Sequence, residues 1–243
     1  MNNELIRFII FFFSVIIYTI IWGKTIDTLV KSKYVLRIAK FLMNYSRLKL
    51  DQIRFVIIWS GYLFISMIGT IIFSIIFKIN IFDYISLKNF KEVVLYSIIG
   101  FTVQLSLSST ILTIISLIKT DINWFTVVSN INWVKISSKL PKSLKPLYPL
   151  SGAFFEELYF RGCVFIIILT EFKFVNPAIG IALVSILFVI QQSLNTQTVY
   201  QTISMSVGSM CISVVGCVLI LATNSFIPAL LCHQFYVIFY LRN

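Results

Sequence analysis

The chain has 243 residues, of which 58% are hydrophobic and only 12% are charged, and its mean hydropathy is +0.94. Soluble domains carry about 25% charged residues, and a domain of this size could not bury so much apolar surface in a single core. The composition therefore excludes a soluble globular protein, a disordered chain and a disulfide scaffold, and it indicates a membrane protein. The net charge of +11 would suggest nucleic-acid binding in a soluble protein, but here it must be read against the bilayer.

Seven apolar segments approach the roughly 20 residues that a helix needs to cross the hydrocarbon core. In chain order they are 5–22, 55–77, 93–118, 150–170, 177–192, 202–222 and 226–241. We predict an all-α fold: a polytopic membrane bundle of about seven transmembrane helices with additional interfacial amphipathic helices. We expect one integrated membrane domain, in which residues 1–147 form N-terminal membrane helices with basic cytoplasmic segments and residues 148–243 form the core that carries the site.

The basic residues are divided unequally between the segments that link these spans. With the N-terminus outside, the inner segments hold 14 Lys and Arg residues, mainly in 23–54 and 119–149, and the outer segments hold 5. Because cytoplasmic loops are enriched in Lys and Arg, we predict a multi-pass cell-membrane protein with its N-terminus outside and both basic segments in the cytoplasm. There they face a lipid bilayer with an anionic inner leaflet. The positive charge then reflects topology, and no nucleic-acid partner is expected.

Two stretches within the basic segments, 24–49 and 121–136, have apolar residues at helical spacing. In the first stretch the apolar and basic residues fall on different faces: Val30, Tyr34, Ile38, Phe41 and Tyr45 against Lys33, Arg37 and Lys40. This pattern predicts helices that lie on the cytoplasmic leaflet. They would act as topology anchors or, alternatively, dock a substrate.

Three ionisable residues crowd into the fourth apolar segment, where 154–162 reads Phe-Phe-Glu-Glu-Leu-Tyr-Phe-Arg-Gly. Each charge inside a span costs about 2.5–3.5 kcal/mol on insertion scales, so such residues point to function. Glu157 and Arg161 are four residues apart and share a helix face, which predicts an ion pair. Glu156 points about 100° away and has no local cation, so it is a candidate general base. A purely structural ion pair would leave Glu156 unexplained.

Two further polar features lie nearer the C-terminus. His233 is the only histidine and falls within the last apolar segment, where it is either a satisfied buried residue or a partner of the acidic pair. Gln191, Gln192 and Asn195 close the fifth segment and form either an interfacial helix end or part of a site. The four cysteines lie in apolar segments without metal-ligand spacing. With a single histidine we therefore predict no zinc site and no cofactor.

The acidic cluster resembles the first motif of the CAAX-protease and bacteriocin-processing (CPBP, or Abi) family of intramembrane endopeptidases. That motif, Glu-Glu-x-x-x-Arg, is complete in Glu156, Glu157 and Arg161. The resemblance spans about residues 148–241.

The two later motifs of that family are matched only in part. Phe-x-x-x-His on the next helix resembles 188–192, with Gln192 in place of histidine. His-x-x-x-Asn on the last helix resembles 233–237, with Val237 in place of a polar residue. Glutamine can position a water molecule but cannot carry a proton, and an oxyanion hole that lacks one donor loses about 10²–10³ in rate.

The resemblance implies an intramembrane endopeptidase that cleaves a peptide or membrane-associated protein. Glu156 would activate a water molecule with help from Gln192, and His233 would help to hold the oxyanion. Glu157 and Arg161 would brace the site, which would work as a glutamate protease without a metal. The residues expected to bind substrate are Phe160, Phe188 and Asn195.

Two other classes of function remain open at this point. The departures in the later motifs favour a non-catalytic relative, a membrane accessory, immunity or scaffold protein that binds a peptide or membrane-protein partner in the same cavity. A small transporter could use the buried charges as a relay, but the sequence has neither an internal repeat nor a pair of Gly/Pro-interrupted helices.

Overall fold

The computed structural model describes residues 2–86, 90–119 and 122–242, and within them the chain is helical and has no strand. Four helices are long and apolar enough to cross a membrane by length and composition: α1 (Asn2–Lys31), α3 (Leu50–Phe77), α4 (Phe90–Ile118) and α10 (Val199–Thr223). Two shorter apolar helices are α9 (Pro177–Ser193) and α11 (Ile227–Arg242). The predicted all-α membrane class is therefore confirmed.

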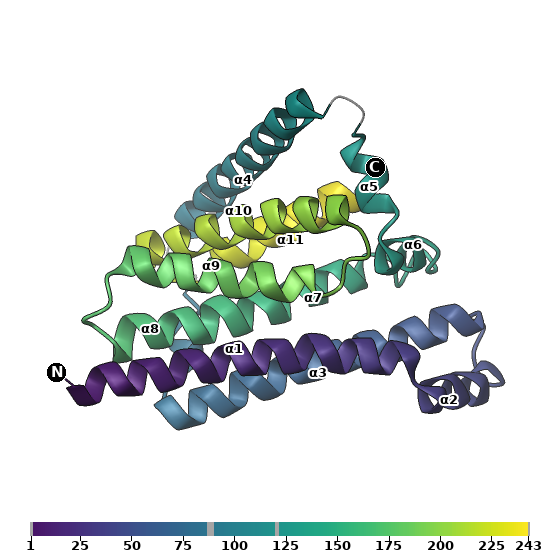
Figure 1. Ribbon diagram of the computed structural model, residues 1–243, viewed down its shortest axis with the longest axis horizontal. Coiled ribbons are helices and arrows are strands. Elements are labelled where there is room, and N and C mark those ends of the chain that lie inside the picture. The colour runs from purple at the N-terminus through teal and green to yellow at the C-terminus, as the bar shows by residue number, and fades with distance from the viewer. Residues whose placement is uncertain (1, 87–89, 120–121, 243) are drawn as a thin grey trace.

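The helices form layers around a central rod (Figure 1). α1 and α3 pack against each other on one side, and α4 lies on the far side against α10 and α11. The fourth apolar segment runs between them as α7 (Leu147–Tyr159), a π-helical turn η2 (Phe160–Phe165) and α8 (Ile166–Glu171). α7 contacts both α3 and α11, so it joins the N-terminal helices to the C-terminal ones.

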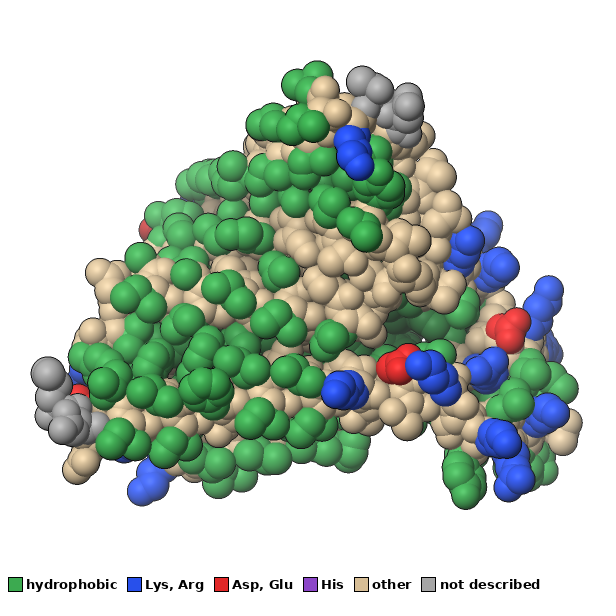
Figure 2. Space-filling view, viewed as in Figure 1, with side chains coloured by type: hydrophobic (Ala, Val, Ile, Leu, Met, Phe, Trp, Pro, Cys, Tyr) green, Lys and Arg blue, Asp and Glu red, His purple; other side chains and the backbone are tan. Residues whose placement is uncertain are grey.

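The part of the central rod from Phe160 to Ile168 is enclosed by other helices, and all of its residues except Arg161 are apolar. From Phe160 to Ile168 every residue is buried. The outer helices behave differently: their exposed residues are large and apolar, among them Ile10 and Phe13 of α1 and Ile98 of α4. Figure 2 shows hydrophobic side chains over α1 and α4 and a concentration of Lys and Arg at the end that carries α2 (Lys33–Met43) and α6 (Asn132–Ser138). This distribution suits a protein whose flanks face lipid and whose basic end faces a leaflet surface.

The expectation of one interfacial helix within 24–49 is wrong in its bounds. α1 continues to Lys31, and the Ser32 hydroxyl then accepts hydrogen bonds from the backbone N–H groups of Tyr34 and Val35. This N-cap starts a separate helix, α2 (Lys33–Met43). The predicted apolar stripe is exposed, with Tyr34 73% and Phe41 60% accessible, which suits a helix lying on lipid.

The second amphipathic stretch, 121–136, also divides into two helices. They are α5 (Trp124–Ser129) and α6 (Asn132–Ser138), and Ile131 between them is fully buried. Lys88, counted above on the outer side, and residues 120–121 of the basic segment 119–149 lie outside the described residues.

Gly69 of α3 lies against tyrosine rings from both α1 and α7. A Cβ atom at Gly69 would lie 2.4 Å from Tyr18 Cε1 and 2.8 Å from Tyr159 Cε2, well inside van der Waals contact. The Tyr18 hydroxyl also donates a hydrogen bond of 2.5 Å to the backbone oxygen of Ile65. Glycine is therefore required here by packing between helices.

We predict that Gly69→Ala destabilises the protein, because the added methyl group must push aside the buried ring of Tyr159 and the half-buried ring of Tyr18, at a cost of about 1–3 kcal/mol. Thermal unfolding in detergent measures the effect. Gly152→Ala is the matched control, since it is also a helical glycine but a Cβ there meets nothing within 4 Å. Equal melting temperatures for the two variants would show that the contact at Gly69 is unimportant.

Candidate active site

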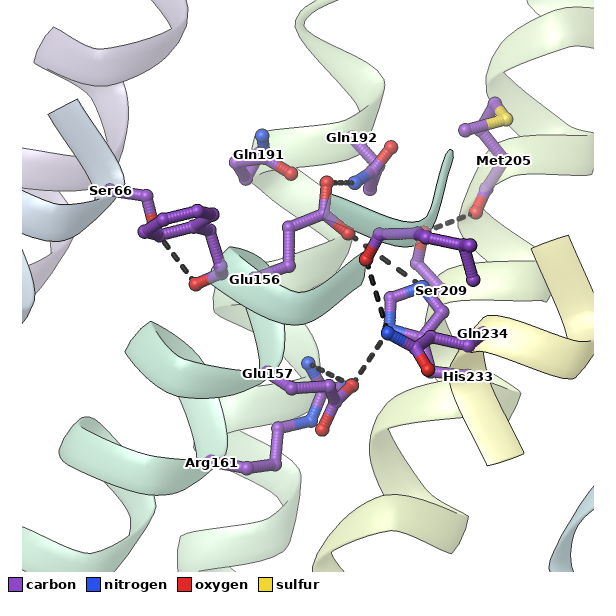
Figure 3. Close-up of polar contacts among 12 residues, drawn as sticks. Ser66, Glu156, Glu157, Arg161, Gln191, Gln192, Met205, Ser209, His233 and Gln234 are labelled. Atoms are coloured by element: carbon purple, nitrogen blue, oxygen red, sulfur yellow. Dashed lines mark hydrogen bonds and ion pairs between the residues drawn. The ribbon is translucent and has the colours of Figure 1, made fainter. Parts of the chain in front are cut away.

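The acidic pair lies near the middle of the bundle, where α7 passes between α3 and α11 and close to the end of α9. Glu157 is fully buried and Glu156 is 8% exposed. The same helical turn thus presents one carboxylate to the packed interior and the next to a cavity. Figure 3 shows Glu156 pointing toward Gln192 and Glu157 pointing toward Arg161 and His233.

Glu157 is bound by two partners through one oxygen. Its Oε1 atom lies 3.3 Å from Arg161 Nη1 and 2.8 Å from His233 Nδ1. The Arg161 guanidinium is fully buried and lies 4.4 Å above the ring centre of Phe188, an additional cation–π contact. The ion pair predicted between Glu157 and Arg161 is therefore confirmed, and it also fixes the ring of His233.

Glu156 has three partners, and each comes from a different helix. Its Oε1 atom accepts hydrogen bonds from Gln192 Nε2 of α9, at 2.9 Å, and from the Tyr62 hydroxyl of α3. Its Oε2 atom lies 3.7 Å from His233 Nε2 of α11. The local sequence offered no cation near Glu156, but the fold supplies one ionisable partner and two hydrogen-bond donors.

The four ionisable groups constrain one another because a net charge is costly in an apolar interior. Two carboxylates, Glu156 and Glu157, share one arginine, Arg161. The His233 imidazole lies between the two carboxylates: its Nδ1 atom is 2.8 Å from Glu157 Oε1, and its Nε2 atom is 3.7 Å from Glu156 Oε2 beside the cavity.

A cavity of about 600 Å³ opens beside Glu156. The space-filling view shows a hollow above the charged end of α1 (Figure 2). The walls come from α1, α3, α6, α7, α10 and α11, and from the end of α9 with the residues that follow it. The residues that matter for the site and line this cavity are Tyr62, Glu156, Phe188, Gln192, Asn195, His233 and Val237.

Phe160 lies elsewhere. It is fully buried and is not part of the cavity wall; its ring packs 5.1 Å from that of Phe188 and stacks on Trp22 at 6.1 Å. Phe188 in turn contacts the His233 ring edge-on at 5.8 Å. Phe160 therefore supports Phe188 and has no direct access to the cavity.

The residues of the site do not fit a zinc ion. Zinc takes three or four protein ligands. His233 Nδ1 is occupied by Glu157, which leaves Glu156 and His233 Nε2 as the ligand atoms facing each other. Within the described residues, no group of three or more His, Cys, Asp or Glu side chains is placed to hold a metal.

Tyr62 was not among the site residues predicted from the sequence, and Gln191 was predicted only as part of the polar end of the fifth apolar segment. Gln191 is fully buried and its Nε2 atom donates a 2.6 Å hydrogen bond to the Tyr62 hydroxyl. Tyr62 lies in an apolar span, and a tyrosine in such a span does not by itself indicate a functional role. Its role could have been predicted only by knowing that α3 packs against α7.

Part of the chain is similar to a known family. Residues 144–239 match the family model described as type II CAAX prenyl endopeptidase Rce1-like. No curated protein and no solved structure matches the chain. The matched segment is consistent with the CPBP family and contains Glu156, Glu157, Arg161 and His233, whereas Tyr62 lies outside it.

We predict that Arg161→Met strongly destabilises the protein. The substitution keeps much of the volume but leaves the buried Glu157 carboxylate with His233 alone, and breaking a buried ion pair costs about 3–5 kcal/mol. Thermal unfolding in detergent measures the loss. Arg7→Met is the control, because Arg7 pairs with Glu171 at 3.9 Å and its side chain is 63% exposed. If Arg161→Met unfolds at the same temperature as the parent protein, the Glu157–Arg161 pair does not stabilise the fold.

Proposed function

From the family that residues 144–239 match, we propose that the chain is an intramembrane endopeptidase in which Glu156 activates water. One observation carries the proposal: Glu156, Gln192 and His233, which are far apart in the sequence, converge at one cavity from α7, α9 and α11. A carboxylate next to an imidazole and an open space is the arrangement that general acid–base hydrolysis needs.

The proposed reaction uses the chain's own groups. A water molecule in the cavity gives a proton to Glu156 while its oxygen attacks the carbonyl carbon of the scissile peptide bond. His233 Nε2 donates a hydrogen bond to the oxyanion that forms. Glu156 then returns the proton to the leaving amide nitrogen, and the C–N bond breaks. Gln192 orients Glu156, and Glu157 with Arg161 holds the His233 ring.

The substrate is proposed to be a peptide or membrane-associated protein, in line with the family description. Phe188 and Asn195 border the cavity and are proposed to contact it. Phe160, expected above to bind substrate, is proposed to act through Phe188, against which it packs.

A second candidate function is favoured by one specific observation. Val237 lines the cavity at the position where the family places a polar residue, so this position offers no donor to an oxyanion. Gln192 likewise cannot carry a proton. Such a site could bind a peptide or partner protein without cleaving it, as an accessory, immunity or scaffold protein would.

The topology is proposed from the charges. We take the seven apolar segments as seven spans, with residues 1–147 and 148–243 forming one domain, the N-terminus outside and residues 23–54 and 119–149 in the cytoplasm. Asp27, Lys31, Asp51 and Arg54 come from the first basic segment and line the cavity, which then opens toward the cytoplasmic leaflet. A substrate would reach Glu156 from that side.

We predict that Glu156→Gln abolishes peptide cleavage, because the amide has nearly the same shape but cannot accept the water proton. Purified protein in liposomes is incubated with membrane-bound peptides, including one with a prenylated CAAX end, and the products are identified by mass spectrometry. Glu171→Gln, an exposed glutamate at the end of α8, is the matched control and should cleave normally.

Two further measurements sharpen this test. Gln192→His restores the family residue and should preserve or raise activity, and chelators should have little effect. If parent and Glu156→Gln give the same products, the enzyme proposal is wrong. Retained peptide binding by both would then favour the accessory function.

We predict that a cysteine introduced at Lys40, in a background without the four native cysteines, is not labelled by an impermeant reagent on intact cells. The control is Phe82→Cys, since Phe82 is 77% exposed and lies in the predicted outer segment between α3 and α4. Labelling at position 40 but not at position 82 would show that the chain has the opposite orientation in the membrane.

A further inference from the structure

Tyr62 contributes to the site from a part of the chain that the family match does not cover. It lies on α3, lines the cavity and donates a hydrogen bond from its hydroxyl to Glu156 Oε1. Its hydroxyl oxygen accepts a hydrogen bond from Gln191 Nε2 at 2.6 Å. Gln191, Tyr62 and Glu156 therefore form a chain of hydrogen bonds that ends on the proposed base.

The direction of this chain follows from the chemistry of its members. An ionised carboxylate can only accept hydrogen bonds, and a phenol has a single proton to donate. If that proton is directed at Glu156, Gln191 must present its N–H group to the phenol oxygen. The Tyr62 hydroxyl thus determines which way the Gln191 amide is turned. Because Gln191 presents its N–H group, it offers the Tyr62 proton no acceptor, and that proton is donated to Glu156.

Two donors on one oxygen restrict the Glu156 side chain. Tyr62 and Gln192 both bind Oε1, so Oε2 is the atom turned toward His233. A glutamate side chain without such contacts is free to adopt several rotamers, and misplacing a reacting group by about 1 Å can cost 10²-fold in rate.

The Tyr62 ring is itself held in place by α1. Trp22 is fully buried and its ring centre lies 4.8 Å from that of Tyr62. α1 and α3 therefore complete a site whose central ionisable cluster, Glu156, Glu157, Arg161 and His233, lies in the C-terminal half of the chain.

We infer that Tyr62 is a positioning residue for the hydrolysis, holding Glu156 Oε1 so that Oε2 receives the water proton, with Gln191 orienting the phenol. The inference rests on the proposed function. Tyr62 keeps its own proton throughout the reaction, so the proton balance given above is unchanged.

The test begins with Tyr62→Phe, which removes the hydroxyl and keeps the ring against Trp22. We expect kcat for the peptide cleaved by the parent protein to fall by about 10- to 100-fold, with KM changed by less than about threefold, because the substrate does not bind through this hydroxyl. Tyr18→Phe is the matched control: it also loses a hydroxyl that binds across α1 and α3, but Tyr18 does not line the cavity. Its kcat should remain that of the parent.

Two substitutions at Gln191 separate positioning from simple packing. Gln191→Glu places an acceptor beside the phenol, which turns the Tyr62 proton away from Glu156, so kcat should fall about as far as in Tyr62→Phe. Gln191→Met removes a hydrogen bond but leaves that proton for Glu156, so kcat should fall by less than about threefold. In the Tyr62→Phe background, Gln191→Glu should cause no further loss, since coupled residues are not additive.

The outcomes distinguish this inference from the proposed function. Parental kcat in Tyr62→Phe together with an inactive Glu156→Gln overturns the role of Tyr62 and leaves the endopeptidase intact. Absence of any Glu156-dependent cleavage overturns both. If Tyr62→Phe unfolds, equal losses in Gln191→Glu and Gln191→Met contradict the inference, and a large loss in the first alone supports it.

Discussion

The structure depends on keeping two adjacent carboxylates inside an apolar bundle. Glu157 is compensated by Arg161 from the next turn of its own rod and by His233 from α11. A buried charge without such partners would be far more costly than any single packing contact. The pairing therefore ties α11 to the central rod, and it fixes the His233 ring with Nε2 toward the cavity. The orientation of His233 that the proposed catalysis requires thus follows from the need to pair the buried Glu157 carboxylate.

The helices around this cluster differ in what their side chains face. Residues 160–168 of the central rod, which follow the acidic pair, are all buried, whereas α1 and α4 present large apolar residues outward. Close contact of the outer layer with the rod requires small residues, as at Gly69. Tyr62 of α3 lines the cavity, and Trp22 of α1 packs against its ring. The N-terminal helices thus shape the cavity as well as anchoring the chain.

The all-α class and the Glu157–Arg161 pair could be predicted from the sequence for physical reasons. Length and hydropathy define apolar helices directly, and a spacing of four residues places Glu157 and Arg161 on one face whatever surrounds them. The contacts between distant helices could not be read in that way. Tyr62 carries no local mark of its role, and the burial of Phe160 depends on the packing of Trp22 and Phe188. The break at Ser32 was missed because the apolar spacing of 24–49 continues across it, although serine is a good N-cap.

The π-helical turn at Phe160–Phe165 has a consequence for how the rod can vary. A π turn accommodates one residue more than an α turn, so it shifts the helix downstream by about 100° relative to the helix upstream. The π turn therefore fixes the angle between the face of α7 that carries Glu156 and Glu157 and the faces that α8 presents to its neighbours. Loss of a single residue from this turn would bring the two halves back into phase, and every side chain beyond it would face a different helix. The rod therefore consists of two helical parts with a fixed angular offset between them. Glu156 and Glu157 both lie in the part that precedes the π turn.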